Sequence, residues 1–136
     1  MQHNESNIQI VCVRWFRQHY PKYATLMFSV PNGGYRHIQT AIRMHNEGMT
    51  AGVSDLILLM PSGDGVFHSL CIEMKTLAKT SKQSTAQKDW QKQIEQVGNC
   101  YKVVHCFEEF VHVVRAYIGE KRTDNLSKGY GITNRN

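Results

Sequence analysis

The sequence predicts an α/β fold in which a mixed β-sheet is flanked by α-helices. Two observations lead to this prediction. Segments with helical periodicity alternate along the chain with short, apolar, β-prone runs. Two of these runs are separated only by the turn-forming segment 61–65, which predicts a hairpin within the otherwise alternating order. With 136 residues, the chain is long enough to bury one core.

The part of the chain before the hairpin predicts a helix, a strand and a second helix. Apolar residues in the range 5–19 recur at helical spacing, and Pro21 ends that helix. The run 25–30 is β-prone and predicts a short strand. Residues 35–47 predict a second helix that ends before Gly48. Its inward side chains are expected to be Ile38, Ala41 and Ile42.

The hairpin itself occupies residues 55–75. Its first strand, 56–60, is continuously apolar, which predicts burial on both faces. The returning strand covers residues 66–75 and alternates. Alternation puts one set of side chains on each face, Leu70, Ile72 and Met74 on one and Cys71, Glu73 and Lys75 on the other.

The remainder of the chain predicts a helix at 84–97, a strand at 101–106 and a last helix at 107–118. Beyond that helix the sequence is polar and has no apolar periodicity. We therefore predict a single domain over residues 1–118, followed by a loose polar tail over 119–136.

Composition narrows the class of protein. The sequence is 41% hydrophobic, and no apolar run approaches the roughly 20 residues that cross a bilayer. Residues 1–5 are polar and include an acid, unlike a secretory signal. We therefore expect a globular cytoplasmic protein without a membrane partner. A net charge of +5, from 16 Lys and Arg against 11 Asp and Glu, is compatible with a polyanionic partner without requiring one.

The cysteines are scattered, and the sequence contains no CxxC pair. Cys12, Cys71 and Cys106 lie within apolar segments, which favours reduced, partly buried thiols. The alternative is a zinc site at a local cluster of Cys100, His105 and Cys106.

The residues that point to chemistry are Asp55, Glu73 and Lys75. Glu73 and Lys75 are two apart on a predicted strand, so they project to the same side. A turn near residues 63–65 places Asp55 across from the stretch 71–75, where it can lie beside Glu73. Two converging carboxylates suit Mg²⁺ or Mn²⁺. Such a metal can activate a water for phosphodiester hydrolysis, and Lys75 can orient that water or stabilise the developing charge.

The alternative for this trio is a surface ion pair, because acids and bases two apart on strands often pair without any catalytic role. The flanking residues favour a functional role. Asp55 and Glu73 each adjoin an apolar run. A charge at the end of a buried strand is costly unless it is paired or bound to a metal.

A longer pattern surrounds the trio. In order, it comprises Pro31-Asn32-Gly33-Gly34, Arg36, Gly48, Gly52-Val53-Ser54-Asp55-Leu56, Ile72-Glu73-Met74-Lys75-Thr76, Ser84, Gln87, Trp90 and Gly98. This pattern, over roughly residues 30–115, resembles the PD-(D/E)XK nuclease superfamily and, more narrowly, the virus-type replication-repair nuclease (VRR-NUC) family. One position departs from the family, which usually has Pro where this chain has Ser54.

The resemblance implies a restriction-endonuclease-like fold, with Mg²⁺ or Mn²⁺ at Asp55 and Glu73 and with Lys75 as the third catalytic residue. It also implies structure-selective DNA cleavage in replication, repair or recombination, and no organic cofactor. Short stand-alone members look like homodimeric, junction-resolving enzymes of phage or bacterial origin, so branched DNA and four-way (Holliday) junctions are the expected substrates. A two-fold axis in a homodimer can place two active sites on two strands of a junction.

Three further polar residues are candidates for the site. In this superfamily a helical acid at the position of Glu5 often assists the metal, although the helix dipole also favours an acid in a first turn. Gln9 is one turn further on and is a weaker candidate for the same site. Gln87 matches the family's helical Gln near the active site, with a capping box on Ser84 as the alternative. Trp90, one turn later, is expected in the core.

Four basic residues are candidates for DNA contacts. Lys79, Lys82 and Lys88 surround the loop after Lys75 and can meet phosphates. Arg36, on the second predicted helix, is similar. The alternative for each is an ordinary solvated charge.

Three functions are therefore open. The first is a divalent-metal-dependent endonuclease acting on structured DNA. The second is a structure-specific DNA-binding module with the same fold and no turnover. The third is an unrelated domain in which the trio forms an ion-pair cluster. The intact trio favours the first, since a degenerate relative usually loses one of the three residues.

Overall fold

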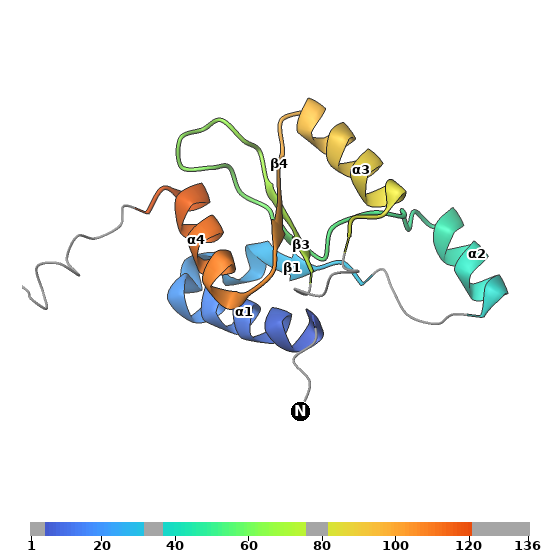
Figure 1. The fold of residues 1–136 in the computed structure, drawn as a ribbon, viewed down its shortest axis with the longest axis horizontal. Coiled ribbons are helices and arrows are strands. Elements are labelled where there is room, and N and C mark those ends of the chain that lie inside the picture. The colour runs from blue at the N-terminus through green and yellow to red at the C-terminus, as the bar shows by residue number, and fades with distance from the viewer. Residues whose placement is uncertain (1–4, 32–36, 76–81, 121–136) are drawn as a thin grey trace, which may run out of the picture.

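The computed structural model describes residues 5–31, 37–75 and 82–120. The helices and strands within these ranges alternate, as the sequence predicts (Figure 1). In chain order they are α1 (Glu5–His19), a 3-10 helix η1 (Pro21–Leu26), β1 (Met27–Ser29), α2 (Ile38–Asn46), β2 (Leu56–Leu58), β3 (Leu70–Met74), α3 (Thr85–Gln96), β4 (Cys100–Val104) and α4 (Phe107–Ile118).

The described strands form one mixed sheet in the order β1-β2-β3-β4. The hairpin pair β2 and β3 is antiparallel, and so is the pair β1 and β2. Strands β3 and β4 are parallel. A parallel pair needs a crossover connection, and α3 supplies it. The prediction of a mixed sheet flanked by helices is confirmed.

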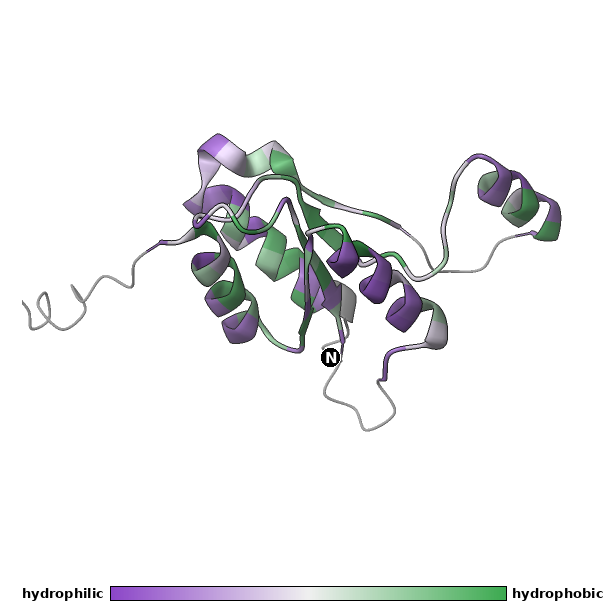
Figure 2. Ribbon diagram, turned by 90° about the horizontal axis from the view of Figure 1, so that it is seen from above, coloured by the Kyte–Doolittle hydropathy of each residue, from purple (hydrophilic) through white to green (hydrophobic). Residues whose placement is uncertain are grey.

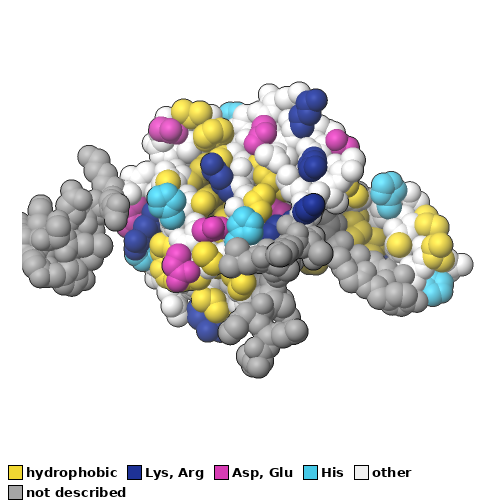
Figure 3. Space-filling view, viewed as in Figure 1, with side chains coloured by type: hydrophobic (Ala, Val, Ile, Leu, Met, Phe, Trp, Pro, Cys, Tyr) yellow, Lys and Arg dark blue, Asp and Glu magenta, His cyan; other side chains and the backbone are white. Residues whose placement is uncertain are grey.

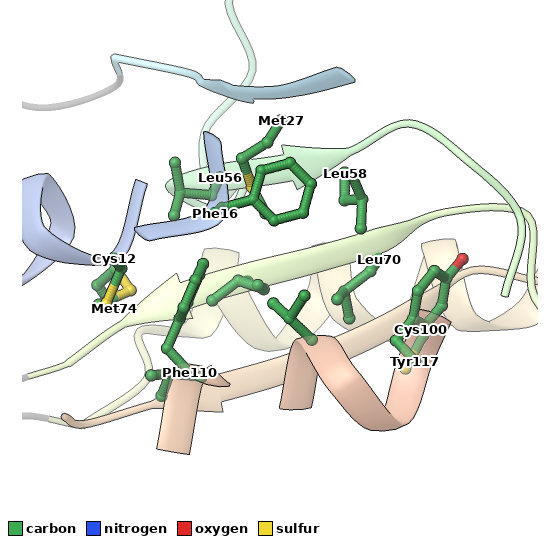
Figure 4. Close-up of a cluster of buried hydrophobic side chains, with 13 residues drawn as sticks. Cys12, Phe16, Met27, Leu56, Leu58, Leu70, Met74, Cys100, Phe110 and Tyr117 are labelled. Atoms are coloured by element: carbon green, nitrogen blue, oxygen red, sulfur yellow. The ribbon is translucent and has the colours of Figure 1, made fainter. Parts of the chain in front are cut away.

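The main core lies between the sheet and the pair of helices α1 and α4 (Figure 4). Phe16 of α1 and Phe110 of α4 are completely buried there, against Leu56 and Ile72 of the sheet. Helix α3 lies on the opposite face, and Figure 2 shows it as the most hydrophilic of the helices near the sheet. The apolar layer is therefore concentrated on one face, which leaves the other face available for polar side chains.

Alternation along β3 gives each face the residues that the sequence predicts. Leu70, Ile72 and Met74 belong to the core cluster with α1 and α4. Glu73 lies between two of these core residues, so its side chain projects to the other face, where it meets α3. All of β3 is buried, because both faces of the strand are covered.

Two burial predictions are wrong. Ile38 is 70% exposed and Ile42 is 56% exposed, because α2 stands away from the rest of the molecule (Figures 1 and 2). The apolar spacing of α2 indicated a helix face but not whether a neighbour covers it. In the segment 56–60, Leu59 is 59% exposed because β2 ends at Leu58 and the chain then leaves the sheet.

The first and last helices have the boundaries that the sequence predicts. Helices α1 and α4 cover 5–19 and 107–118 as predicted. Strand β1 is shorter than the predicted run 25–30, because η1 occupies its first residues. The predicted tail falls mostly at 121–136, outside the described residues. No helix in the described ranges is long and apolar enough to cross a membrane.

The cysteine thiols are free, and three of the four are buried. Burial raises the pKa of Cys12 to about 12 and also raises the pKa of Cys71 and Cys100. Cys106 is half-buried. Among the described residues, no group of three or more His, Cys, Asp or Glu side chains is arranged to hold a metal ion.

Candidate active site

Asp55 and Glu73 lie opposite each other at the end of the hairpin. The register pairs Leu56 with Ile72, so the next pair outward is Asp55 with Glu73. Directly opposed residues of an antiparallel pair project to the same face, with Cβ atoms roughly 4.5–5.5 Å apart. The Asp55 carboxylate also bridges the two strands, because its Oδ2 atom accepts a hydrogen bond of 2.7 Å from the backbone N–H of Met74. The hairpin thus brings together the two carboxylates that the sequence singled out.

Neighbouring backbone groups hold Asp55 in place. Its carbonyl oxygen accepts a hydrogen bond of 2.9 Å from the N–H of Val30. Ser54, at the position where the family usually has Pro, is completely buried. Its hydroxyl donates to the carbonyl of Leu56 at 3.1 Å, so the buried polar group is satisfied and the turn into β2 is fixed without proline.

Glu73 is 4% exposed and is stabilised by groups from two elements. The ammonium of Lys75 lies 3.8 Å from its Oε2 atom. The side-chain amide of Gln87 on α3 donates to the same Oε2 atom at 2.8 Å. A buried carboxylate is costly without such partners. The ion pair and the hydrogen bond therefore allow Glu73 to stay inside the fold beside Asp55.

Gln87 forms the capping box that the sequence offered as one alternative, and it also contacts Glu73. The side-chain Oε1 atom of Gln87 accepts a hydrogen bond of 2.8 Å from the backbone N–H of Ser84. The backbone N–H of Gln87 donates to the Ser84 hydroxyl at 3.1 Å. These two bonds form the capping box of α3. Because the cap occupies the amide oxygen, the amide NH₂ group faces Glu73. The capping box therefore orients Gln87 toward the site.

Gly52 brings the loop before Asp55 into direct contact with the first turn of α3. Its φ is +89°, a conformation that side chains disfavour. A Cβ atom at this position would lie 2.3 Å from the carbonyl oxygen of Ala86, closer than any real contact. Only glycine allows this approach, which places the Asp55 loop and Gln87 on the same side of the sheet.

A family model matches the sequence of this chain, and a solved structure matches its fold. The model of the VRR-NUC domain matches residues 3–108. The chain belongs to the VRR-NUC family. A solved structure described as a VRR_NUC domain protein superimposes with a TM-score of 0.73 at 24% sequence identity, and the match covers 88% of this chain and 91% of that one. No curated protein matches significantly.

VRR-NUC is a nuclease family, so membership supports a DNA nuclease. The family match includes Asp55, Glu73, Lys75 and Gln87. It ends within α4 and does not reach the range 109–136. The structural neighbour supports the same fold, including the mixed sheet.

For the remaining candidate residues of this VRR-NUC domain, the structure gives little or no side-chain information. Helix α1 begins at Glu5, whose side chain is outside the described residues. Gln9 is half-buried on the second turn of α1. Arg36 and Lys79 both fall in ranges that the structure leaves undescribed.

Of the four candidates for DNA contacts, the two that the structure describes lie on or beside α3. Lys82 and Lys88 are exposed, and Lys88 follows Gln87 directly. Lys92, which sequence reasoning did not single out, is exposed one turn further along α3. Figure 3 shows lysine side chains over this helix with acidic side chains among them, because α3 also carries the exposed Asp89 and Glu95. The described surface on and beside α3 thus carries both lysines and acids, with Lys82 as the lysine just before the helix.

Sequence reasoning also missed Tyr101 and Gln83. Tyr101 pairs with Cys71 across the parallel strands and is 5% exposed. Burial, followed by the negative charges of Glu73 and Asp55, raises the pKa of Tyr101 to about 12, although the hydrogen bond from Gln83 opposes this rise. Alternation along β4 could have indicated that Tyr101 faces inward. Its position beside Cys71 could not have been predicted, because the register of a parallel pair cannot be read from sequence.

Proposed function

We propose that this VRR-NUC domain is a divalent-metal-dependent endonuclease that hydrolyses phosphodiester bonds in structured DNA. Branched DNA and four-way (Holliday) junctions are its proposed substrates, and replication, repair or recombination is the proposed setting. The observation that carries the proposal is the register that sets Asp55 against Glu73, with Lys75 3.8 Å from the Glu73 carboxylate.

The donor set fits Mg²⁺ or Mn²⁺. Asp55 and Glu73 would hold the ion, and hard cations of this size are commonly bound by one or two carboxylates, with water and substrate phosphate as the other ligands. When bound, the ion supplies a water of lowered pKa and neutralises phosphate charge. Glu5, where α1 begins, is proposed as a further ligand because a helical acid at this position often assists the metal in the superfamily that the sequence resembles.

The chain's own residues divide the other tasks. Lys75 is a cation beside the Glu73 carboxylate, suited to orienting the attacking water and stabilising charge that develops on the phosphate. Gln87 holds one oxygen of Glu73 through a 2.8 Å hydrogen bond, which restricts rotation of the carboxylate. Both effects reduce the reorganisation needed during the reaction.

Basic residues near α3 are proposed to contact DNA. Lys82 and Lys88 are exposed beside the site, and Arg36 and Lys79 are proposed from the sequence. Phosphate contacts of this kind position the duplex and carry no sequence information. That property suits an enzyme that selects DNA by shape.

The decisive experiment is a cleavage assay on a panel of labelled DNAs: single strand, duplex, flap, splayed arm and four-way junction. Each DNA is incubated with Mg²⁺, Mn²⁺ or EDTA. We expect metal-dependent cutting, and we expect Asp55→Ala, Glu73→Ala and Lys75→Ala each to abolish it while circular dichroism shows an intact fold. Full activity in all three variants would refute the proposal. DNA binding without any product would instead favour the non-cleaving module.

The proposed active form is a homodimer. Helix α2 has no buried residue among those described and exposes two isoleucines, Ile38 and Ile42, on a segment that stands off the body. Exposed apolar faces of this kind commonly mark protein interfaces. Light scattering after size exclusion is expected to give twice the chain mass of 15.6 kDa. A monomer at micromolar concentration, with or without DNA, would exclude this assembly.

A further inference from the structure

Tyr101 connects strand β4 to the start of α3. The side-chain amide of Gln83 donates to the Tyr101 hydroxyl at 3.2 Å and to the Oε1 atom of Gln91 at 2.8 Å. The ring of Trp90 meets the Tyr101 ring at a steep angle, with 6.2 Å between the centroids. Both contacts join the sheet to α3, one just before the helix begins and one in its second turn.

The hydrogen bond between Gln83 and Tyr101 lies next to the capping box that orients the side chain of Gln87. Gln83 immediately precedes Ser84, the N-cap residue of α3. Ser84 in turn holds Gln87 through the capping box, and Gln87 donates to Glu73. Helix ends fray unless they are tied to the rest of the fold. The Tyr101 hydroxyl is such a tie.

We propose that Tyr101 is a positioning residue of the nuclease site: through Gln83, its hydroxyl fixes the first turn of α3 on the sheet and so holds the Gln87 amide against Glu73. Tyr101 itself need not touch the substrate, since it is 5% exposed. The inference rests on the proposed function only where it treats Glu73 as a metal ligand.

The first test needs neither metal nor DNA. Tyr101→Phe removes the hydroxyl and keeps the ring that packs on Trp90. Hydrogen exchange should then become severalfold faster at the amides of Gln87 and Lys88, which bond to the hydroxyl and the carbonyl of Ser84. Unchanged exchange at both amides would overturn the proposal.

Tyr117→Phe is the matched control. Tyr117 is 7% exposed, and its hydroxyl donates to the carbonyl of Met60 at 2.8 Å. It belongs to the core cluster on the other face of the sheet. The control therefore removes an equally buried tyrosine hydroxyl without touching α3. Equal acceleration of the α3 amides in Tyr117→Phe would mean a general loss of stability and would also overturn the proposal.

The second test asks whether Tyr101 acts through Gln87. Calorimetric titration with Mn²⁺ should give a severalfold weaker affinity for Tyr101→Phe than for the wild type. Cleavage by Tyr101→Phe should recover at saturating Mn²⁺. In a Gln87→Ala background, Tyr101→Phe should weaken Mn²⁺ binding no further, because the link is already broken. Additive losses would show that Tyr101 acts by another route.

The two tests separate the two proposals. If the wild type neither binds Mn²⁺ nor cuts DNA, the proposed function fails, and with it the catalytic meaning of the contact. The exchange experiment still decides whether Tyr101 positions the first turn of α3. If the wild type binds Mn²⁺ and Tyr101→Phe binds it equally well, only the positioning inference fails.

Discussion

Glu73 is a carboxylate kept inside the fold by one cation and one amide. Lys75 and Gln87 both act on its Oε2 atom, at 3.8 and 2.8 Å. Charged residues in such positions seldom improve stability over apolar ones, because desolvation offsets the pairing energy. Their presence therefore agrees better with a role in chemistry than with a role in folding.

Glu120 is a carboxylate with a structural role, in contrast to the catalytic role proposed for Glu73. It accepts hydrogen bonds from Tyr20 and His19 and lies 3.4 Å from the Nε atom of Arg115, so it ties the end of α4 to the end of α1. The hydrogen bond from Tyr20, followed by that from His19, lowers the pKa of Glu120 below its ordinary value of 4.5. The ionised form is therefore favoured in the folded state.

Glu120→Gln should make stability less dependent on pH. A lowered folded-state pKa adds stability above pH 4.5 that is lost as pH falls through the folded pKa. We therefore expect the variant to be less stable than the wild type at pH 7, by about 1 kcal/mol at most because the group is partly exposed. The difference should disappear in acid, as urea unfolding at pH 7 and pH 3 would show.

Glu47→Gln is the control for that measurement. Glu47 pairs with Arg43 at 3.0 Å on the exposed surface of α2, where an ion pair contributes little. A stability difference for Glu120→Gln that is the same at pH 7 and pH 3 would contradict the assigned role of the charge.

At the scale of elements, the site is assembled where the hairpin meets the first turn of α3. The hairpin supplies both carboxylates, and α3 supplies Gln87. The contact between Gly52 and the backbone of Ala86 sets the distance between the two elements. A small displacement there moves Gln87 relative to Glu73.

Gly52→Ala should therefore damage both stability and the site. The new methyl group would overlap the carbonyl of Ala86, and the positive φ adds strain. We expect a loss of more than about 2 kcal/mol in free energy of unfolding, measured by urea denaturation. Cleavage activity should fall more than the folded fraction does, because α3 is pushed from the sheet.

Gly65→Ala is the control that adds backbone strain without the steric overlap expected in Gly52→Ala. Gly65 has a similar φ of +77°, but a Cβ atom there would meet nothing within 4 Å. We expect this variant to lose only about 1 kcal/mol and to keep full activity. If the two alanine variants behaved alike, the contact with α3 would have no special importance.

At the scale of the whole molecule, charge is distributed unevenly. The chain carries a net charge of +5, and Figure 3 shows exposed lysines over α3, where the acids Asp89 and Glu95 lie among them. Lys88 and Lys92 are one turn apart on that helix, so they face the same side. Such a surface suits a phosphate backbone that leads into the site.

Neutralising this surface should reduce the salt dependence of DNA binding. For Lys88→Gln combined with Lys92→Gln, the slope of log K against log salt should fall by about one for each lysine that meets a phosphate. Fluorescence anisotropy in EDTA with a labelled junction measures it. Lys22→Gln is the control, because Lys22 is exposed on η1, which packs on α1 and β1. Equal slopes for both variants would place the DNA elsewhere.

The sequence alone determined most of the local order. Periodicity predicted α1 and α4 to the residue, because each has one long apolar face and a clear end at Pro21 or Gly119. Alternation predicted that Glu73 and Lys75 project to one side, and a reversal centred near residues 63–65 predicted the pairing that brings Asp55 to Glu73. The predicted strands were too long, because β2 ends at Leu58 and β3 begins only at Leu70. These are local properties, set by backbone geometry and by nearby residues.

Only the tertiary structure decided which faces are covered and which distant groups meet. The apolar side of α2 is exposed although its pattern resembles that of a buried helix. Gln87 completes its capping box and reaches Glu73 at once, and Tyr101 ties the start of α3 to the sheet. These contacts depend on how α3 crosses between the parallel strands β3 and β4. A parallel register joins segments far apart in the sequence, so no local pattern encodes it.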